Sequence, residues 1–254
     1  MSKQPDSKQP DSKQADSKQA DSKQAKQNSV GISRDTLKRG DVMDAARARD
    51  GANSAILSDE ALLASRRAIV PDNYVGEDIW VFGYGSLIWN PMVQYSEKLD
   101  ALVHGFHRRF CMWTRIGRGS PECPGLVLAL DNGGATKGVI FRIPADIAPQ
   151  ELDLLWRREM MADSYRPVWL TAKTNKGPVR ALSFAIRRNR PVFAPPMPDT
   201  EVARIIYQAK GFVGPCKDYL ENTQKALLDA GIHDEQMIRL AALVKQLEAA
   251  ENDI

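Results

Sequence analysis

Short apolar runs alternate with clusters of glycine, proline and asparagine through the middle of the chain, a pattern typical of strands and turns. One of these runs, Ile79 to Phe82, is bulky and has high strand propensity. Clusters of turn residues, such as 117–125 and 132–134, separate the runs that follow it. The pattern predicts strands at 79–83, 101–113, 126–130, 138–143, 167–173 and 179–186.

Helical periodicity dominates the regions on either side of these strands. Ser58, followed by two acidic residues, predicts a helix that ends before Pro71. A looser polar helix is expected over 33–50, weakened by Gly40. In the last quarter of the chain, glycines follow two of the apolar-periodic stretches, as is common after helices. The pattern predicts helices at about 200–210, ending at Gly211, at 217–230, and from 234 onward.

The clearest helix in the middle of the chain is predicted at 149–161. Four residues at i, i+3, i+4 and i+7 share one face: Leu152, Leu155, Trp156 and Glu159. A carboxylate therefore continues an inward apolar stripe, whereas Arg157 and Arg158 are expected to point elsewhere. A buried glutamate with a raised pKa suits general acid–base catalysis near neutral pH. A structural glutamate, bonded to a buried N–H or an arginine, is the commoner explanation of such a position.

A tight glycine loop is predicted directly after the first strand, where residues 79–91 read IWVFGYGSLIWNP. Gly83 and Gly85 permit positive φ and close approach of a ligand to the backbone. Successive N–H groups in such a loop can form a nest that holds an anion such as a carboxylate. Tyr84 and Ser86 would add hydroxyls at its mouth. A β-bulge followed by a second buried strand explains the same pattern without any ligand.

Composition narrows the class of protein. The chain has 254 residues, 43% of them hydrophobic, and no apolar run long enough to span a bilayer. The polar N-terminus shows no secretory signal. The three cysteines are scattered and odd in number, which argues against a disulfide scaffold or a zinc site and favours a reducing, cytoplasmic location. The three histidines suggest neither a metal site nor a catalytic triad, and the phosphate-loop and dinucleotide fingerprints are absent.

The beginning of the chain is a low-complexity repeat. Residues 2–26 are five copies of a pentapeptide, SKQPD twice, SKQAD twice and SKQAK once, with nothing apolar to bury. We expect this segment to be disordered and without a role in the chemistry. Residues 1–27 hold six lysines and four aspartates and so carry +2 of the net charge of +3. The nearly neutral remainder gives no electrostatic reason to expect a nucleic-acid partner.

Six segments, in fixed order, resemble the ChaC-like γ-glutamylcyclotransferases. They are FGYGSLIW (82–89), GFHRRF (105–110), RGSPECPGL (118–126), GVIFRI (138–143), WRREM (156–160) with Tyr165, and GFVGPCKDYL (211–220). Together they cover residues 79 to 225 and look closest to the bacterial members. We therefore expect a tail at 1–27, a helical extension at 28–75 packed on the outside, and a γ-glutamylcyclotransferase domain at 76–254.

The resemblance implies an α+β fold, a small mixed β-barrel flanked by helices, with the active site at the mouth of the barrel. It also implies cleavage of glutathione to 5-oxoproline and cysteinylglycine without cofactor or metal. In this reaction the α-amine of the substrate attacks its own γ-carbonyl, so no protein nucleophile is needed. Glu159 would be the catalytic acid/base. Substrate contacts would come from Phe82, Gly83, Tyr84, Gly85, Ser86, Leu87, Tyr165 and Arg115.

Alternatives remain open at this point. The same chemistry could act on other γ-glutamyl amines or amino acids, because contacts to the leaving group lie in loops. A non-catalytic γ-glutamyl-binding protein is a second alternative, although it has no evident need for a buried base. The segment 115–125 is either a lid or anion-contacting loop, through Arg115 and Arg118, or a solvated surface loop. We expect a monomer with a small-molecule substrate and no membrane partner.

Overall fold

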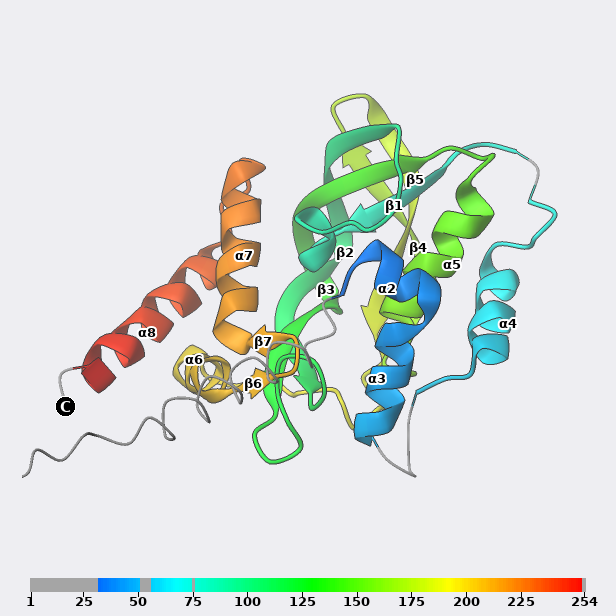
Figure 1. The fold of residues 1–254 in the computed structure, drawn as a ribbon. Helices are drawn as coiled ribbons and strands as arrows, with labels where there is room; N and C mark the ends of the chain where they lie inside the picture. Colours follow the sequence, from blue (N-terminus) through cyan, green and yellow to red (C-terminus); the bar gives the residue numbers. More distant parts are fainter. Residues whose placement is uncertain (1–31, 51–55, 75, 253–254) are drawn as a thin grey trace, which may run out of the picture.

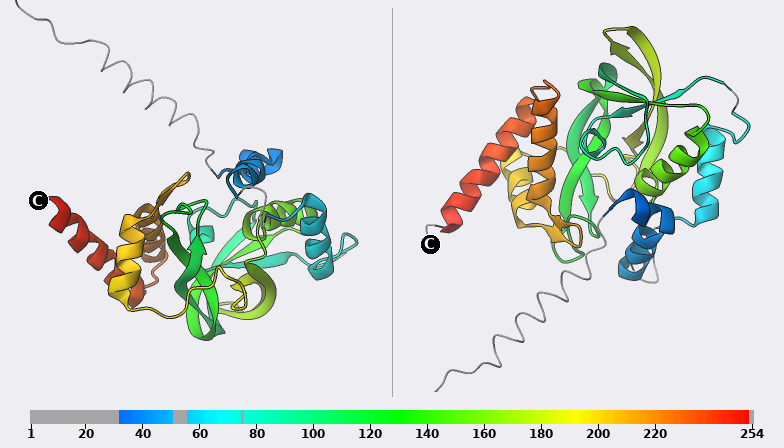
Figure 2. Two further views of the ribbon diagram at one scale, coloured as in Figure 1. Left: turned by 90° about the horizontal axis from the view of Figure 1, so that it is seen from below. Right: turned by 45° about the horizontal axis from the view of Figure 1, so that its top comes forward.

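A closed five-stranded barrel with helices on two sides forms the body of the protein. The structure, a computed structural model, describes residues 32–50, 56–74 and 76–252, so the pentapeptide repeat lies outside the described residues. In Figure 1 helices α2 to α5 lie on one side of the barrel and α6 to α8 on the other, and both views of Figure 2 agree. This arrangement confirms the predicted α+β fold.

The barrel mixes parallel and antiparallel pairs. Its strands are ordered β1 (Ile79–Gly83), β3 (Gly125–Ile143), β2 (Glu97–Thr114), β4 (Tyr165–Thr174) and β5 (Gly177–Ile186). These neighbours pair antiparallel, whereas β1 and β5 pair parallel and close the barrel. The interior is apolar, with Phe82, Val103, Leu130 and Ile140 completely buried. Burial of these strand faces fixes the register of the barrel.

The strands predicted at 126–130 and 138–143 are one strand, so the expected separation at 132–134 is wrong. Strands β2 and β3 pair over almost their whole length, and the register shifts where Gly105 faces Gly133 and Gly134. All three glycines have positive φ. Because cross-strand pairing resumes beyond them, the glycine cluster accommodates a β-bulge that bends the ribbon instead of a turn that ends it.

Four helices cover one side of the barrel: α2 (Arg34–Arg39), α3 (Asp41–Asp50), α4 (Asp59–Ile69) and α5 (Ala148–Glu159). Ser33 and Ser58 cap α2 and α4, as their sequence signals predict. Gly40 ends α2 in a left-handed conformation, so the loose helix expected at 33–50 is two helices. The carboxylate of Glu151 in α5 accepts hydrogen bonds from the Arg34 guanidinium and joins the N-terminal helices to the barrel.

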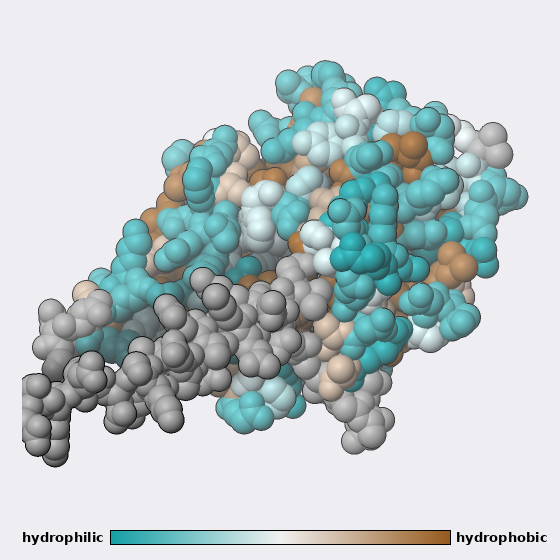
Figure 3. Space-filling model, viewed as in Figure 1, coloured by the Kyte–Doolittle hydropathy of each residue, from teal (hydrophilic) through white to brown (hydrophobic). Residues whose placement is uncertain are grey.

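The other side carries α6 (Asp199–Gln208), α7 (Cys216–Asp229) and α8 (Glu235–Asn252). The helix expected to run to Gly211 ends earlier, because β6 (Lys210–Gly211) and β7 (Gly214–Pro215) form a small hairpin. The face shown in Figure 3 is largely hydrophilic, with scattered apolar residues. None of the described helices combines the length and apolar character needed to cross a membrane.

Candidate active site

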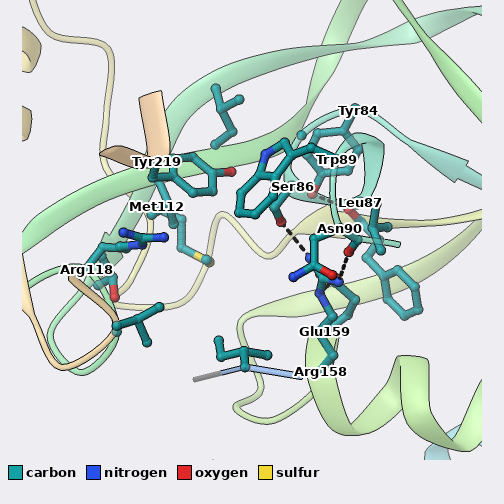
Figure 4. A pocket seen from close by; sticks show the side chains of 18 of the residues that line it. Tyr84, Ser86, Leu87, Trp89, Asn90, Met112, Arg118, Arg158, Glu159 and Tyr219 are labelled. Atoms are coloured by element: carbon teal, nitrogen blue, oxygen red, sulfur yellow. Dashed lines mark hydrogen bonds and ion pairs between the residues drawn. The ribbon is translucent and has the colours of Figure 1, made fainter. Parts of the chain in front are cut away.

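A cavity of about 320 Å³ opens between the two sets of helices. Its walls come from segments far apart in the chain, and Figure 4 shows their side chains converging on it. One wall is the loop after β1, another is the end of α5, and the third combines the loop 115–125 with the hairpin β6–β7 and the start of α7. The lining includes Tyr84, Gly85, Ser86, Leu87, Trp89, Asn90, Met112, Arg118, Arg158, Glu159, Tyr165, Val213 and Tyr219.

The glycine loop enters a single 3₁₀ turn, η2 (Ser86–Ile88), at the cavity wall. A Cβ atom on Gly85 would lie 3.2 Å from the Tyr219 hydroxyl, so a side chain here would press on the opposite wall. Gly85 does not have positive φ, and close approach is therefore its role. Among the described residues, no group accepts a hydrogen bond from the backbone N–H of Ser86 or Leu87.

Glu159 is the last residue of α5, and its side chain reaches the cavity wall with 14% of its surface exposed. Burial raises the pKa of its carboxyl above the ordinary value, and the charge of Arg158 opposes that rise. Its Oε1 lies 3.0 Å from the Arg158 Nε. The helix thus delivers a poorly solvated carboxylate to a cavity that is otherwise lined mainly by apolar and aromatic groups.

Arg158 does not point away from Glu159, so that expectation is wrong. Its guanidinium donates to the backbone carbonyl of Asn90 and, at 2.9 Å, to the Ser86 hydroxyl (Figure 4). Because α5 ends at Glu159, its last side chains extend toward the loop after β1. Arg157 does point elsewhere, since it donates to the carbonyl of Leu37 on α2. Arg158 therefore ties the glycine loop to the end of α5.

Three buried phenols line the same cavity as the carboxylate: Tyr84, Tyr165 and Tyr219. Burial, and then neighbouring groups that include the Glu159 charge, raises the pKa of each above the ordinary tyrosine value. The hydroxyl of Tyr84 donates to the Phe184 carbonyl at 3.2 Å. All three phenols therefore remain protonated near neutral pH and act as hydrogen-bonding groups.

Comparison with known proteins decides the family. A family model described as ChaC-like protein matches residues 79–247, about two thirds of the sequence. The chain belongs to the ChaC-like family. It is 36% identical, over 225 residues, to the glutathione-specific γ-glutamylcyclotransferase of Escherichia coli, covering 87% of this chain and 95% of that protein.

A second relative agrees with this membership, and a solved structure shares the fold. A glutathione-specific γ-glutamylcyclotransferase of Schizosaccharomyces pombe is 34% identical over 169 residues, covering 59% of this chain and 82% of that protein. The crystal structure of a yeast γ-glutamyl cyclotransferase specific to glutathione aligns with a TM-score of 0.62. That alignment covers 67% of this chain and 97% of the yeast chain at 23% identity, so it shows a shared fold.

In this ChaC-like chain, most residues selected from the sequence meet at the cavity. Tyr84, Gly85, Ser86, Leu87, Glu159 and Tyr165 line it. Phe82, Gly83 and Arg115 do not. Phe82 is completely buried in the barrel, Gly83 packs against the Leu87 side chain, and Arg115 is exposed. Substrate contact through these three residues therefore has no support in the geometry.

Two further lining residues were not among the expected substrate contacts, although Arg118 was named with Arg115 as a possible anion contact of the loop 115–125. Arg118, rather than Arg115, reaches the cavity from the loop 115–125, and Tyr219 reaches it from α7. Both belong to segments that resemble the family, but neither spacing nor periodicity indicates that the two segments touch. Within residues 32–50, 56–74 and 76–252, no three His, Cys, Asp or Glu side chains are grouped to hold a metal ion.

Proposed function

We propose that this ChaC-like protein cleaves glutathione by cyclising its γ-glutamyl group, releasing 5-oxoproline and cysteinylglycine. One observation carries the proposal: a single carboxylate with a raised pKa, Glu159, lies at the wall of a cavity beside the glycine loop. Membership of the family supports the choice of substrate, as do the names of its Escherichia coli and Schizosaccharomyces pombe relatives, both glutathione-specific γ-glutamylcyclotransferases.

The first requirement of the reaction is a bent substrate. The backbone N–H groups of Ser86 and Leu87 are free to bind the α-carboxylate of the γ-glutamyl group. Arg158 adds positive charge at the same wall, because it holds the Ser86 hydroxyl. Fixing the α-amine against the γ-carbonyl turns the attack into a well-oriented intramolecular step, which can supply roughly 7–11 kcal/mol of the barrier at best.

The second requirement is a proton acceptor. Tyr84, Tyr165 and Tyr219 stay protonated, and arginine does not act as an acceptor, which leaves Glu159 as the base among the described lining residues. Glu159 takes a proton from the α-ammonium, and the freed amine attacks the γ-carbonyl carbon. As the ring forms, the attacking nitrogen must lose a second proton. When the amide C–N bond breaks, both protons pass through the Glu159 carboxylate to the departing cysteinyl nitrogen, which leaves as an ammonium. Protons therefore balance without a protein nucleophile.

The test is incubation of the purified protein with reduced glutathione, followed by mass spectrometry of the products. We expect 5-oxoproline and cysteinylglycine in equal amounts. Glu159→Gln keeps the shape of the side chain but removes the base, so turnover should fall by about 10²–10⁴-fold. The exposed Glu201→Gln on α6 is the matched control and should keep full activity.

Two results would contradict the proposal. Near-normal turnover by a folded Glu159→Gln protein would remove the base from the mechanism. Release of free glutamate in place of 5-oxoproline would mean that water, and not the substrate amine, attacks the γ-carbonyl.

A further inference from the structure

Arg118 is a cation of the cavity that has no carboxylate partner. The other arginine in the lining, Arg158, is paired with Glu159. None of the ion pairs among the described residues involves Arg118, and its Nη1 donates to the backbone carbonyl of Pro215 at 3.0 Å. A guanidinium has five N–H donors, so this bond leaves most of them available.

The surroundings of Arg118 make its charge costly. Burial lowers the pKa of its guanidinium, and the nearby charge of Asp218 opposes that change without forming an ion pair. A buried or half-buried charge is normally paired. A bound anion would supply the missing partner, and the planar guanidinium fits a carboxylate through two parallel hydrogen bonds.

Two segments of the family resemblance, RGSPECPGL and GFVGPCKDYL, hold Arg118 in place. The hairpin β6–β7 lies directly on the loop 115–125, and a Cβ atom on Gly211 would collide with the carbonyl oxygens of Gly117 and Gly119. The Val213 N–H donates to the Gly117 carbonyl at 3.0 Å. The loop is therefore fastened in this structure, and Arg118 is presented to the cavity from a supported position.

The position of Arg118 in the cavity indicates which part of a substrate it meets. Figure 4 shows Arg118 across the cavity from Glu159, on the side of Met112 and Tyr219. The γ-glutamyl group is placed at the Glu159 side by the proposed chemistry, so the leaving peptide extends toward Arg118. Met112, Val127 and Val213 are among the apolar residues that line the cavity, and they suit an uncharged connecting segment.

We propose that Arg118 binds the C-terminal carboxylate of the leaving peptide, and that the site selects γ-glutamyl peptides ending in a free carboxylate. This inference rests on the proposed function, because the reaction sets the direction of the substrate. In glutathione the group recognised is the glycyl carboxylate. Arg118 is a binding and specificity residue, distant from the bond that breaks.

The experiment compares glutathione with its glycyl monoethyl ester, in which an uncharged ethyl ester replaces the terminal carboxylate. We expect the wild-type protein to favour glutathione in kcat/KM by about tenfold, the effect of one charge-assisted hydrogen bond. Arg118→Gln should lose that preference through a higher KM for glutathione, with the ester little changed. Arg118→Lys keeps the charge and should restore part of the preference. The exposed Arg115→Gln from the same loop is the control and should behave as wild type.

The outcomes separate the two proposals. If wild-type protein cleaves the acid and the ester equally well, or if Arg118→Gln weakens both to the same degree, Arg118 only supports Pro215 and the inference is wrong. If wild-type protein releases 5-oxoproline from neither compound, the proposed function itself fails, and the assignment of Arg118 falls with it.

Discussion

At the scale of single residues, Arg158 controls the ionisation of Glu159. Burial raises the pKa of the Glu159 carboxyl, and the adjacent guanidinium limits the rise. A protonated carboxyl cannot accept the substrate proton, so kcat/KM should increase with pH through this pKa, above the ordinary range of glutamate. Arg158→Gln removes the opposing charge and should move the acidic limb of the pH profile to still higher pH.

The neighbouring arginine provides the control for this measurement. Arg157 lies on the outer face of α5, where it donates to the carbonyls of Leu37 and Lys38. Arg157→Gln should leave the acidic limb where it is. An acidic limb that moves to lower pH in Arg158→Gln would show that another group carries the proton.

The sequence predicts the direction of the Glu159 side chain better than that of Arg158, its ion-pair partner. The i, i+3, i+4, i+7 spacing places Glu159 on the face of α5 that carries Leu152 and Trp156, and both of those side chains are buried. The same periodicity does not predict the direction of the Arg158 side chain, because it assumes that the helix continues. At the last turn a long side chain can reach a neighbouring loop, and only the fold shows that Ser86 and Asn90 are there.

At the scale of elements, one ion pair fastens α2 to α5. The Glu151 side chain is 2% exposed and accepts hydrogen bonds from Arg34 and, at 2.8 Å, from the Gln94 N–H. Burial alone would raise the pKa of this carboxyl, but these bonds hold it below the ordinary value. Arg34→Gln leaves the Glu151 carboxylate buried and replaces the charged guanidinium with a weaker, uncharged amide donor. It should lower the free energy of unfolding by roughly 3 kcal/mol at neutral pH.

The pH dependence checks the cause of that loss. A carboxyl whose folded pKa is lowered stabilises the protein above its unfolded pKa and loses that effect as pH falls through the folded value. The difference between wild type and Arg34→Gln, measured by urea unfolding, should therefore shrink in acid. Arg39→Gln, also on α2, breaks an exposed pair with Asp41 of α3 and should cost much less than Arg34→Gln. Equal losses for the two variants would argue against a special role for the buried pair.

The boundaries of helices and strands could be predicted where capping signals were strong. The predictions were wrong where glycines served a bulge or close packing and not the end of an element. Ser58 and the acidic residues after it marked the start of α4 correctly. Glycines at 133 and 134 looked like a turn, but a bulge in a long ribbon needs the same positive φ. Gly211 looked like a helix end, although its role is close packing on the loop 115–125. Local sequence does not distinguish these uses, because the deciding contact comes from a distant segment.

At the scale of the whole molecule, the cavity joins the two helical sides of the barrel. Glu159 comes from α5 on one side and Tyr219 from α7 on the other, with the loop after β1 between them. Through the family resemblance, the sequence linked Glu159 with the loop after β1. It did not place Arg118 and Tyr219 at the same cavity, since that wall exists only when the hairpin β6–β7 packs on the loop 115–125.

A ligand that spans this cavity should stabilise both sides together. The Glu159→Gln protein binds glutathione without consuming it, and at a concentration 100 times Kd binding should add about 2.7 kcal/mol to the free energy of unfolding. Hydrogen exchange should slow at the loop 84–90 and also at residues 210–219. Cysteinylglycine, which lacks the γ-glutamyl group, is the control and should protect neither segment to the same extent. Protection confined to 84–90 would mean that the leaving peptide does not reach Arg118, whereas protection of both segments requires a substrate stretched between the two helical sides.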